Sequence, residues 1–189
     1  MTPAAAPTAR GSTVHATVEF IQQTYGAALL EQILGQLSRA DRQQLLGAGL
    51  KDHVPYDRVL QLWTAADRTL APIDPEWMEV AGAFSIGSLG RKLYGGLLKK
   101  ASPTEFVTQS VSLFKLFYSH GDVMPVEVTP GRAVLRLVGF DQHGVLFCRR
   151  QIGGLRSAAT IAGGVDVSVK HVRCTVEGDA FCEWEMQWR

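Results

Sequence analysis

Apolar side chains recur every three or four residues over the first two thirds of the chain, which is the spacing of helices with one buried face. This pattern, with its capping residues, predicts helical segments over about 14–50, 55–71, 74–98 and 102–120. The segment 74–98 contains five glycines, each of which weakens a helix by about 1 kcal/mol relative to alanine. We therefore expect this segment to pack closely against another backbone.

The pattern changes from helical to alternating near residue 124. Strands are predicted over about 124–128 and 132–140, followed by a helix with one inward face over 144–162. Two last strands, over about 165–176 and 180–188, are joined by a glycine turn. The order of elements predicts an α+β fold: a helical N-terminal half packed on a small antiparallel sheet, ending in a helix plus a β-hairpin.

Composition and charge are those of an ordinary globular protein, with 46% hydrophobic and 20% charged residues in 189. We expect a flexible tail over 1–13, which is rich in Ala, Pro and Thr, and one domain over 14–189. A net charge of +1 argues against nucleic acid as a partner. The sequence contains no run of about 20 apolar residues, so no membrane span is predicted. Three cysteines are typical of a reducing compartment, so a cytoplasmic location is expected.

The cysteines and one histidine of the C-terminal block form a candidate metal site. The turn of the last hairpin places Cys174 and Cys182 opposite each other, with β-carbons about 5 Å apart. One extra residue near Val172, a β-bulge, brings His171 to the same face as Cys174. Cys148, in the first turn of the preceding helix, is the natural fourth ligand. Three thiolates and an imidazole fit tetrahedral zinc in a closed, structural site.

Two other interpretations of the cysteines stay open at this point. Three small buried cysteines also serve as weak hydrophobes in a core, with His171 an ordinary strand residue. A disulfide between Cys174 and Cys182 is allowed by hairpin geometry but disfavoured by a reducing compartment.

The block around these cysteines resembles the 4-vinyl-reductase domain. The matching residues are Cys148, the run Gln151-Ile152-Gly153, the run His171-Val172-Arg173-Cys174, and Gly178-Asp179 before Cys182. The domain is similar to the sensory domains of phenol- and toluene-responsive transcription activators, where matching cysteines and an acidic residue hold a structural zinc beside an aromatic-effector pocket. His171 stands in place of that acidic residue here. The resemblance implies a stand-alone bacterial member with zinc as its cofactor.

The wider superfamily includes haem-based nitric-oxide sensors and a TRAPP vesicle-tethering subunit that binds an acyl chain, so the resemblance also implies a pocket under the helices. The candidate walls of that pocket are Trp63, Trp77, Phe84, Tyr94, Phe106, Phe114 and Phe117. The expected function is a sensor that binds a small hydrophobic or aromatic ligand and carries a structural zinc. The alternative is a stand-alone interaction or scaffold module without an effector, which forms a homodimer or binds a partner protein through the glycine-rich helix.

An enzyme is not expected, and we assign no catalytic residue. The chain has no nucleotide-binding glycine fingerprint and no nucleophile-elbow motif. The other histidines, at positions 15, 53, 120 and 143, are scattered along the chain, and a lone histidine is seldom a ligand.

Overall fold

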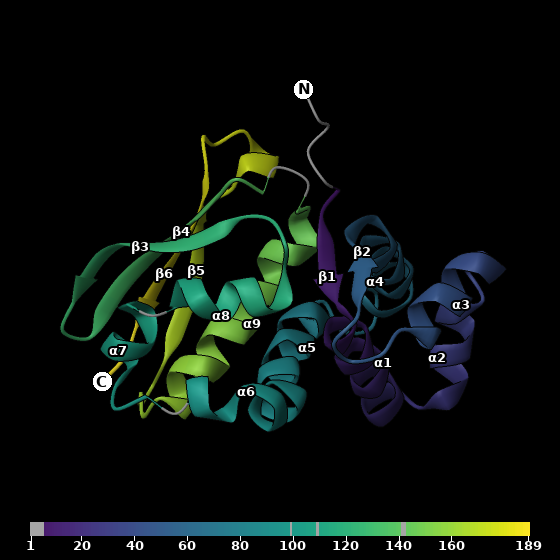
Figure 1. Ribbon diagram of the computed structural model, residues 1–189, viewed down its shortest axis with the longest axis horizontal. Helices are drawn as coiled ribbons and strands as arrows, with labels where there is room; N and C mark the ends of the chain where they lie inside the picture. The colour runs from purple at the N-terminus through teal and green to yellow at the C-terminus, as the bar shows by residue number, and fades with distance from the viewer. Residues whose placement is uncertain (1–5, 99, 109, 141–142) are drawn as a thin grey trace.

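The computed structural model describes residues 6–98, 100–108, 110–140 and 143–189 (Figure 1). Helices dominate the N-terminal half, and the C-terminal half contributes a four-stranded antiparallel sheet with one long helix beside it. The chain ends in that helix and a pair of strands, so the predicted α+β class is confirmed.

The first lobe contains four helices and a two-stranded sheet. They are α1 (Gly11–Tyr25), α2 (Ala27–Leu34), α3 (Arg39–Gly47), α4 (Tyr56–Leu70), β1 (Thr8–Arg10) and β2 (His53–Pro55). Ser38 caps α3 by accepting a hydrogen bond from the backbone N–H of Asp41, as its position in the sequence predicts. The inward face of α4 is buried along its whole length, from Val59 to Leu70.

The prediction of a flexible tail over 1–13 is wrong for residues 8–13. Strand β1 already begins at Thr8 and pairs with β2, and α1 begins at Gly11. The backbone N–H of Gly11 donates to the carbonyl of Asp52 at 2.9 Å. The sequence pattern gives no sign of this order, because the stabilising partners lie about 40 residues further along the chain.

The helix predicted over 74–98 contains a π-helical turn in the structure, and the helix predicted over 102–120 is described on both sides of residue 109, which lies outside the described residues. The first comprises α5 (Trp77–Ser85), a π-helical turn (Ile86–Gly90) and α6 (Arg91–Leu98), and the second comprises α7 (Pro103–Thr108) and α8 (Ser110–Phe117). The close backbone contact predicted for the glycine-rich segment is confirmed. A β-carbon at Gly82 would overlap the carbonyl of Arg150 in the C-terminal helix.

The main sheet has the strand order β3-β4-β6-β5, and every neighbouring pair is antiparallel. Its strands are β3 (Asp122–Thr129), β4 (Arg132–Val138), β5 (Ser168–Arg173) and β6 (Cys182–Gln187). The long helix α9 (Val145–Ile161) packs between this sheet and α5 (Figure 1). Trp184 and Met186 of β6 are fully buried, so the core continues from the helices onto the sheet.

Candidate metal centre and adjoining pocket

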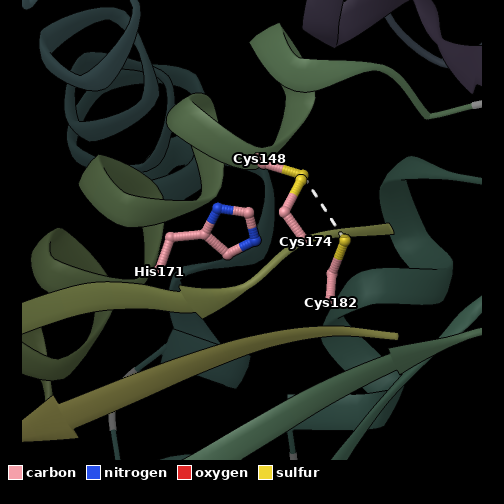
Figure 2. A group of neighbouring side chains, drawn as sticks. All are labelled: Cys148, His171, Cys174 and Cys182. Carbon is pink, nitrogen blue, oxygen red and sulfur yellow. Dashed lines mark hydrogen bonds between the residues drawn. The ribbon is translucent and has the colours of Figure 1, made fainter. Parts of the chain in front are cut away.

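Four side chains from three parts of the chain converge at the end of the sheet next to α9. The ligand atoms of Cys148, His171, Cys174 and Cys182 all lie within 4.8 Å of one another (Figure 2). The three cysteines are buried and His171 is half-buried. The sulfurs of Cys148 and Cys182 are 3.7 Å apart, close to the separation of about 3.8 Å between two sulfurs bound at 2.3 Å to one tetrahedral zinc ion.

A β-bulge brings His171 into this cluster. In the β5–β6 pairing, His171 lies opposite Trp184 and Arg173 lies opposite Glu183, so Val172 is the extra residue. The bulge therefore lies at the position that the parity of the sequence predicts. Because it changes which side chains face inward, His171 and Cys174 share one face despite their spacing of three.

The turn between β5 and β6 holds Cys174 in place. Asp179 accepts a hydrogen bond from the backbone N–H of Cys174 at 2.8 Å and returns one from its own N–H to the carbonyl of Cys174 at 3.0 Å. Gly178 has a φ of +100°, a backbone angle that residues with a β-carbon rarely adopt. The residues Gly178 and Asp179, part of the family-like pattern, thus have a definite structural role.

Several polar groups surround the sulfur of Cys182. The backbone N–H of Thr175 donates to it at 3.3 Å, the hydroxyl of Thr175 lies 3.5 Å away, and Nε2 of His143 lies 3.2 Å away. Nδ1 of His143 bonds the carbonyl of Phe140 and therefore carries the proton, so Nε2 of the neutral ring accepts from Cys182. The backbone N–H of Thr175 is the group that donates to the sulfur, and such a donor stabilises a thiolate. His143 is a residue that sequence reasoning missed, because only the fold brings this loop histidine against β6.

His171 combines packing with an unused polar atom. Its ring stacks on Trp184, with centroids 5.0 Å apart and planes 17° from parallel. Its Nε2 is buried and has no hydrogen-bond partner in the described part of the chain. Burial lowers the pKa of His171, which favours the neutral imidazole that a metal binds.

Without a bound cation, the cluster disfavours the deprotonated, thiolate form of its cysteines. Burial raises the pKa of Cys148, and the neighbouring Cys182 and Cys174 raise it further. Burial likewise raises the pKa of Cys174. All three cysteines are free thiols, contrary to the disulfide alternative. A cation that lowers the cost of three adjacent thiolates, such as zinc, suits this chemistry.

A cavity of about 80 Å³ lies on the other side of α9. Its walls come from α1, α5, the π-helical turn, α7, α8, β3 and α9. Phe106, Phe114 and Phe117 line it together with Tyr118 and Arg150. Most of the lining surface is therefore apolar, with one charged side chain.

The other aromatic residues proposed as pocket walls lie elsewhere or are not described. Trp63 and Trp77 are fully buried core residues, and the indole N–H of Trp77 donates to Asp67 at 2.8 Å. Phe84 packs on Phe20, with ring centroids 5.6 Å apart. The side chain of Tyr94 lies outside the described residues. Helical spacing shows that such residues face inward but not which neighbour each one meets.

Comparison with known proteins gives a match in structure only. No protein-family model matches the chain, and no curated protein sequence matches it. The Fe(II) unliganded H-NOX protein from K. algicida is 10% identical, with a TM-score of 0.72 over 95% of this chain and 96% of that one. A triple mutant of the H-NOX protein from S. oneidensis is 14% identical, with a TM-score of 0.74 over 95% and 96% of the two chains. At this level of identity the comparison establishes the fold alone: the chain has the fold of H-NOX domains.

Proposed function

We propose that this protein is a non-enzymatic sensor domain that binds a small hydrophobic molecule and carries a structural zinc. The observation that carries the proposal is the convergence of three cysteine sulfurs and one imidazole within 4.8 Å. Four protein ligands complete a tetrahedral zinc site, leaving no position for a substrate, so the metal's role is structural. The likeness of the cysteine pattern to the 4-vinyl-reductase domain supports the same assignment.

Zinc at this site would join α9 to the β5–β6 turn. Cys148 comes from the first turn of α9, Cys174 follows β5, and Cys182 begins β6. The unpartnered Nε2 of His171 and the backbone N–H that donates to Cys182 fit such an ion. A metal bound there holds the helix that also forms one wall of the cavity.

Haem is the cofactor that the structural neighbours suggest, since several are described as haem proteins. The cavity does not fit haem. Its described lining includes no histidine, cysteine or methionine to bind the iron axially, and burial raises the pKa of Tyr118, so this phenol is not an anionic ligand. Its volume of about 80 Å³ is also well below the roughly 300–1,000 Å³ typical of ligand and cofactor sites. The metal that we propose is therefore zinc.

The alternative function, a dimeric interaction module built on the glycine-rich helix, has less support. Gly82 packs inside the protein against α9, so that part of the helix already has its partner. Gly95 and Gly96 of α6 have open space beside them and are the part that remains available. None of the helices in the described residues has the length and apolar character needed to cross a membrane. The free thiols are the reason that we propose a cytoplasmic location.

Elemental analysis of the purified protein by mass spectrometry tests the metal. We expect one zinc per chain, lost in both Cys174→Ser and His171→Ala and kept in His120→Ala. The last variant is the matched control because His120 bonds Ser119, outside the cluster. Circular dichroism would check that each variant is folded. A folded wild-type protein without zinc would contradict the proposal. Calorimetric titration with 1-butanol and benzyl alcohol tests the sensing part, and binding of neither would contradict it.

A further inference from the structure

Arg150 is a charged side chain enclosed in the protein interior. Only 4% of its surface is exposed, and it lies on α9 at the edge of the cavity. Taking a guanidinium ion out of water costs several kcal/mol unless an opposite charge or a set of hydrogen bonds compensates it. No carboxylate forms an ion pair with Arg150 in the described part of the chain.

The groups around Arg150 compensate the charge only in part. Its guanidinium carbon lies 5.2 Å from the centre of the Trp63 ring, a cation–π contact on one face. The hydroxyl of Tyr118 is its main electrostatic neighbour and lies within hydrogen-bonding reach of it, yet burial raises the pKa of Tyr118, so this group keeps its proton and stays neutral. Neither Nη1 nor Nη2 makes a hydrogen bond of normal geometry with any described residue.

The cavity gives these two nitrogen atoms an apolar setting. Phe106, Phe114 and Leu155 are among its walls, and Arg150 is the only charged side chain in its described lining. A site with one planar cation and apolar walls selects a ligand with one anionic end and an apolar body. Two parallel N–H groups match the two oxygens of a carboxylate.

We propose that this cavity binds a small monocarboxylate, whose two oxygens pair with Nη1 and Nη2 of Arg150 and whose apolar body packs against the phenylalanines. This inference rests on the proposed sensing function and narrows its ligand class. The cavity of about 80 Å³ is roughly half the 150 Å³ that accommodates benzene in a dry protein interior. The ligand body is therefore short, of the order of butyrate, and benzoate is a probe that exceeds this size.

Isothermal titration calorimetry of the zinc-loaded full chain, at constant ionic strength, tests the inference. The probes are butyrate and benzoate, each paired with the neutral alcohol of the same carbon skeleton, 1-butanol and benzyl alcohol. We expect butyrate to bind at least ~10-fold more tightly than 1-butanol, because hydrogen bonds to charged groups are stronger than those between neutral groups. Benzoate should bind more weakly than butyrate, because its ring exceeds the cavity. Inorganic phosphate should bind more weakly than butyrate, since it has no apolar body to pack against the phenylalanines.

Two variants on α9 separate the role of the charge from that of the helix. Arg150→Met keeps the length of the side chain and removes its charge, so binding of butyrate should fall at least ~10-fold while binding of 1-butanol is kept. Arg156→Met is the matched control, because Arg156 is an exposed arginine on the same helix. Nitrogen-detected NMR of the wild-type guanidinium groups gives a readout that does not depend on how the variant folds. Butyrate should shift the Nη signals of one buried arginine.

The outcomes distinguish the two levels of the proposal. Equal acid binding by the wild type and Arg150→Met, or unchanged Nη signals, would give Arg150 a purely structural role and overturn the inference. Alcohols that bind where acids do not, or phosphate that binds more tightly than butyrate, would overturn the carboxylate assignment and leave the sensing function standing. Binding of none of these probes to folded, zinc-loaded protein would overturn both.

Discussion

Gly153 lies directly against the carbonyl group of Glu79, so α9 and α5 meet backbone to backbone. A β-carbon at position 153 would overlap that carbonyl oxygen, and one at Gly82 would overlap the carbonyl of Arg150 in the opposite direction. The two glycines thus form a reciprocal pair, and the closeness of the helices depends on both of them.

Replacing Gly153 by alanine should therefore destabilise the protein, although alanine is the better helix former. Forcing the helices apart should cost about 1–3 kcal/mol or more of the free energy of unfolding, as overpacking does in other cores. Gly95→Ala in α6 is the matched control, since open space surrounds that position, and it should stabilise by about 0.5–1 kcal/mol. Urea denaturation followed by circular dichroism measures both. Equal effects of the two substitutions would show that the close contact is unimportant.

Removal of the proposed zinc should loosen the contact between α9 and the sheet. We expect EDTA to lower the melting temperature and to change the fluorescence of Trp184. The indole N–H of Trp184 donates to the carbonyl of Cys148 at 3.2 Å, and its ring stacks on His171. The Cys174→Ser variant should show neither response, because it already lacks the metal. A wild-type melting curve that EDTA leaves unchanged would argue against a structural metal.

The hydroxyl of Tyr56 connects α4 to the loop before α9. It donates to the carbonyl of His143 at 2.6 Å, and both groups are buried. Tyr56→Phe removes this buried hydrogen bond and should cost about 1–3 kcal/mol of stability. Tyr25→Phe, which removes a hydroxyl bonded to the partly exposed Asp74, should cost less because water replaces the lost bond. Chemical denaturation of the two variants compares them, and a larger loss for Tyr25→Phe would contradict the argument.

On the exposed side of the sheet, a hydrogen bond from Arg132 lowers the pKa of Glu185 below its ordinary value. The lowered value means that the interaction stabilises the folded state above the unfolded pKa and is lost as the pH falls through the folded pKa. Carbon-13 NMR titration should therefore show the pKa of Glu185 rising in Arg132→Met. Arg136→Met should leave it unchanged, because Arg136 pairs with Glu183 instead. An unchanged titration of Glu185 in Arg132→Met would rule out this cause.

The sequence predicts a feature correctly where the residues that determine it lie close together in the chain, or where the alternation of side chains along a strand determines it. The cap at Ser38, the buried face of α4 and the bulge at Val172 are of this kind. The pattern could not show the pairing of β1, whose partner strand lies about 40 residues away. Nor could it show that the helix after Trp77 contains a π-helical turn, because apolar residues continue at nearly helical spacing through it.

Arg150 and His143 were missed at the site for a related reason. The spacing of α9 predicts one inward face, defined by residues such as Cys148 and Leu155, and Arg150 falls outside that face. In the structure the sheet and α5 cover two different sides of the helix, so the side on which Arg150 lies is also interior. The burial of Arg150 depends on a second element, α5, which packs against another side of α9. The spacing of apolar residues along one helix does not predict such an element.

The placement of Cys148 and Arg150 on one helix has a mechanical consequence. Two residues apart, they project about 200° from each other around the axis of α9, one toward the sheet and the other toward the cavity. If α9 rotated about its own axis so that the guanidinium left the cavity, the thiol of Cys148 would also move away from His171, Cys174 and Cys182. A metal that holds Cys148 would therefore prevent α9 from rotating about its axis, and would fix the direction in which Arg150 points into the cavity.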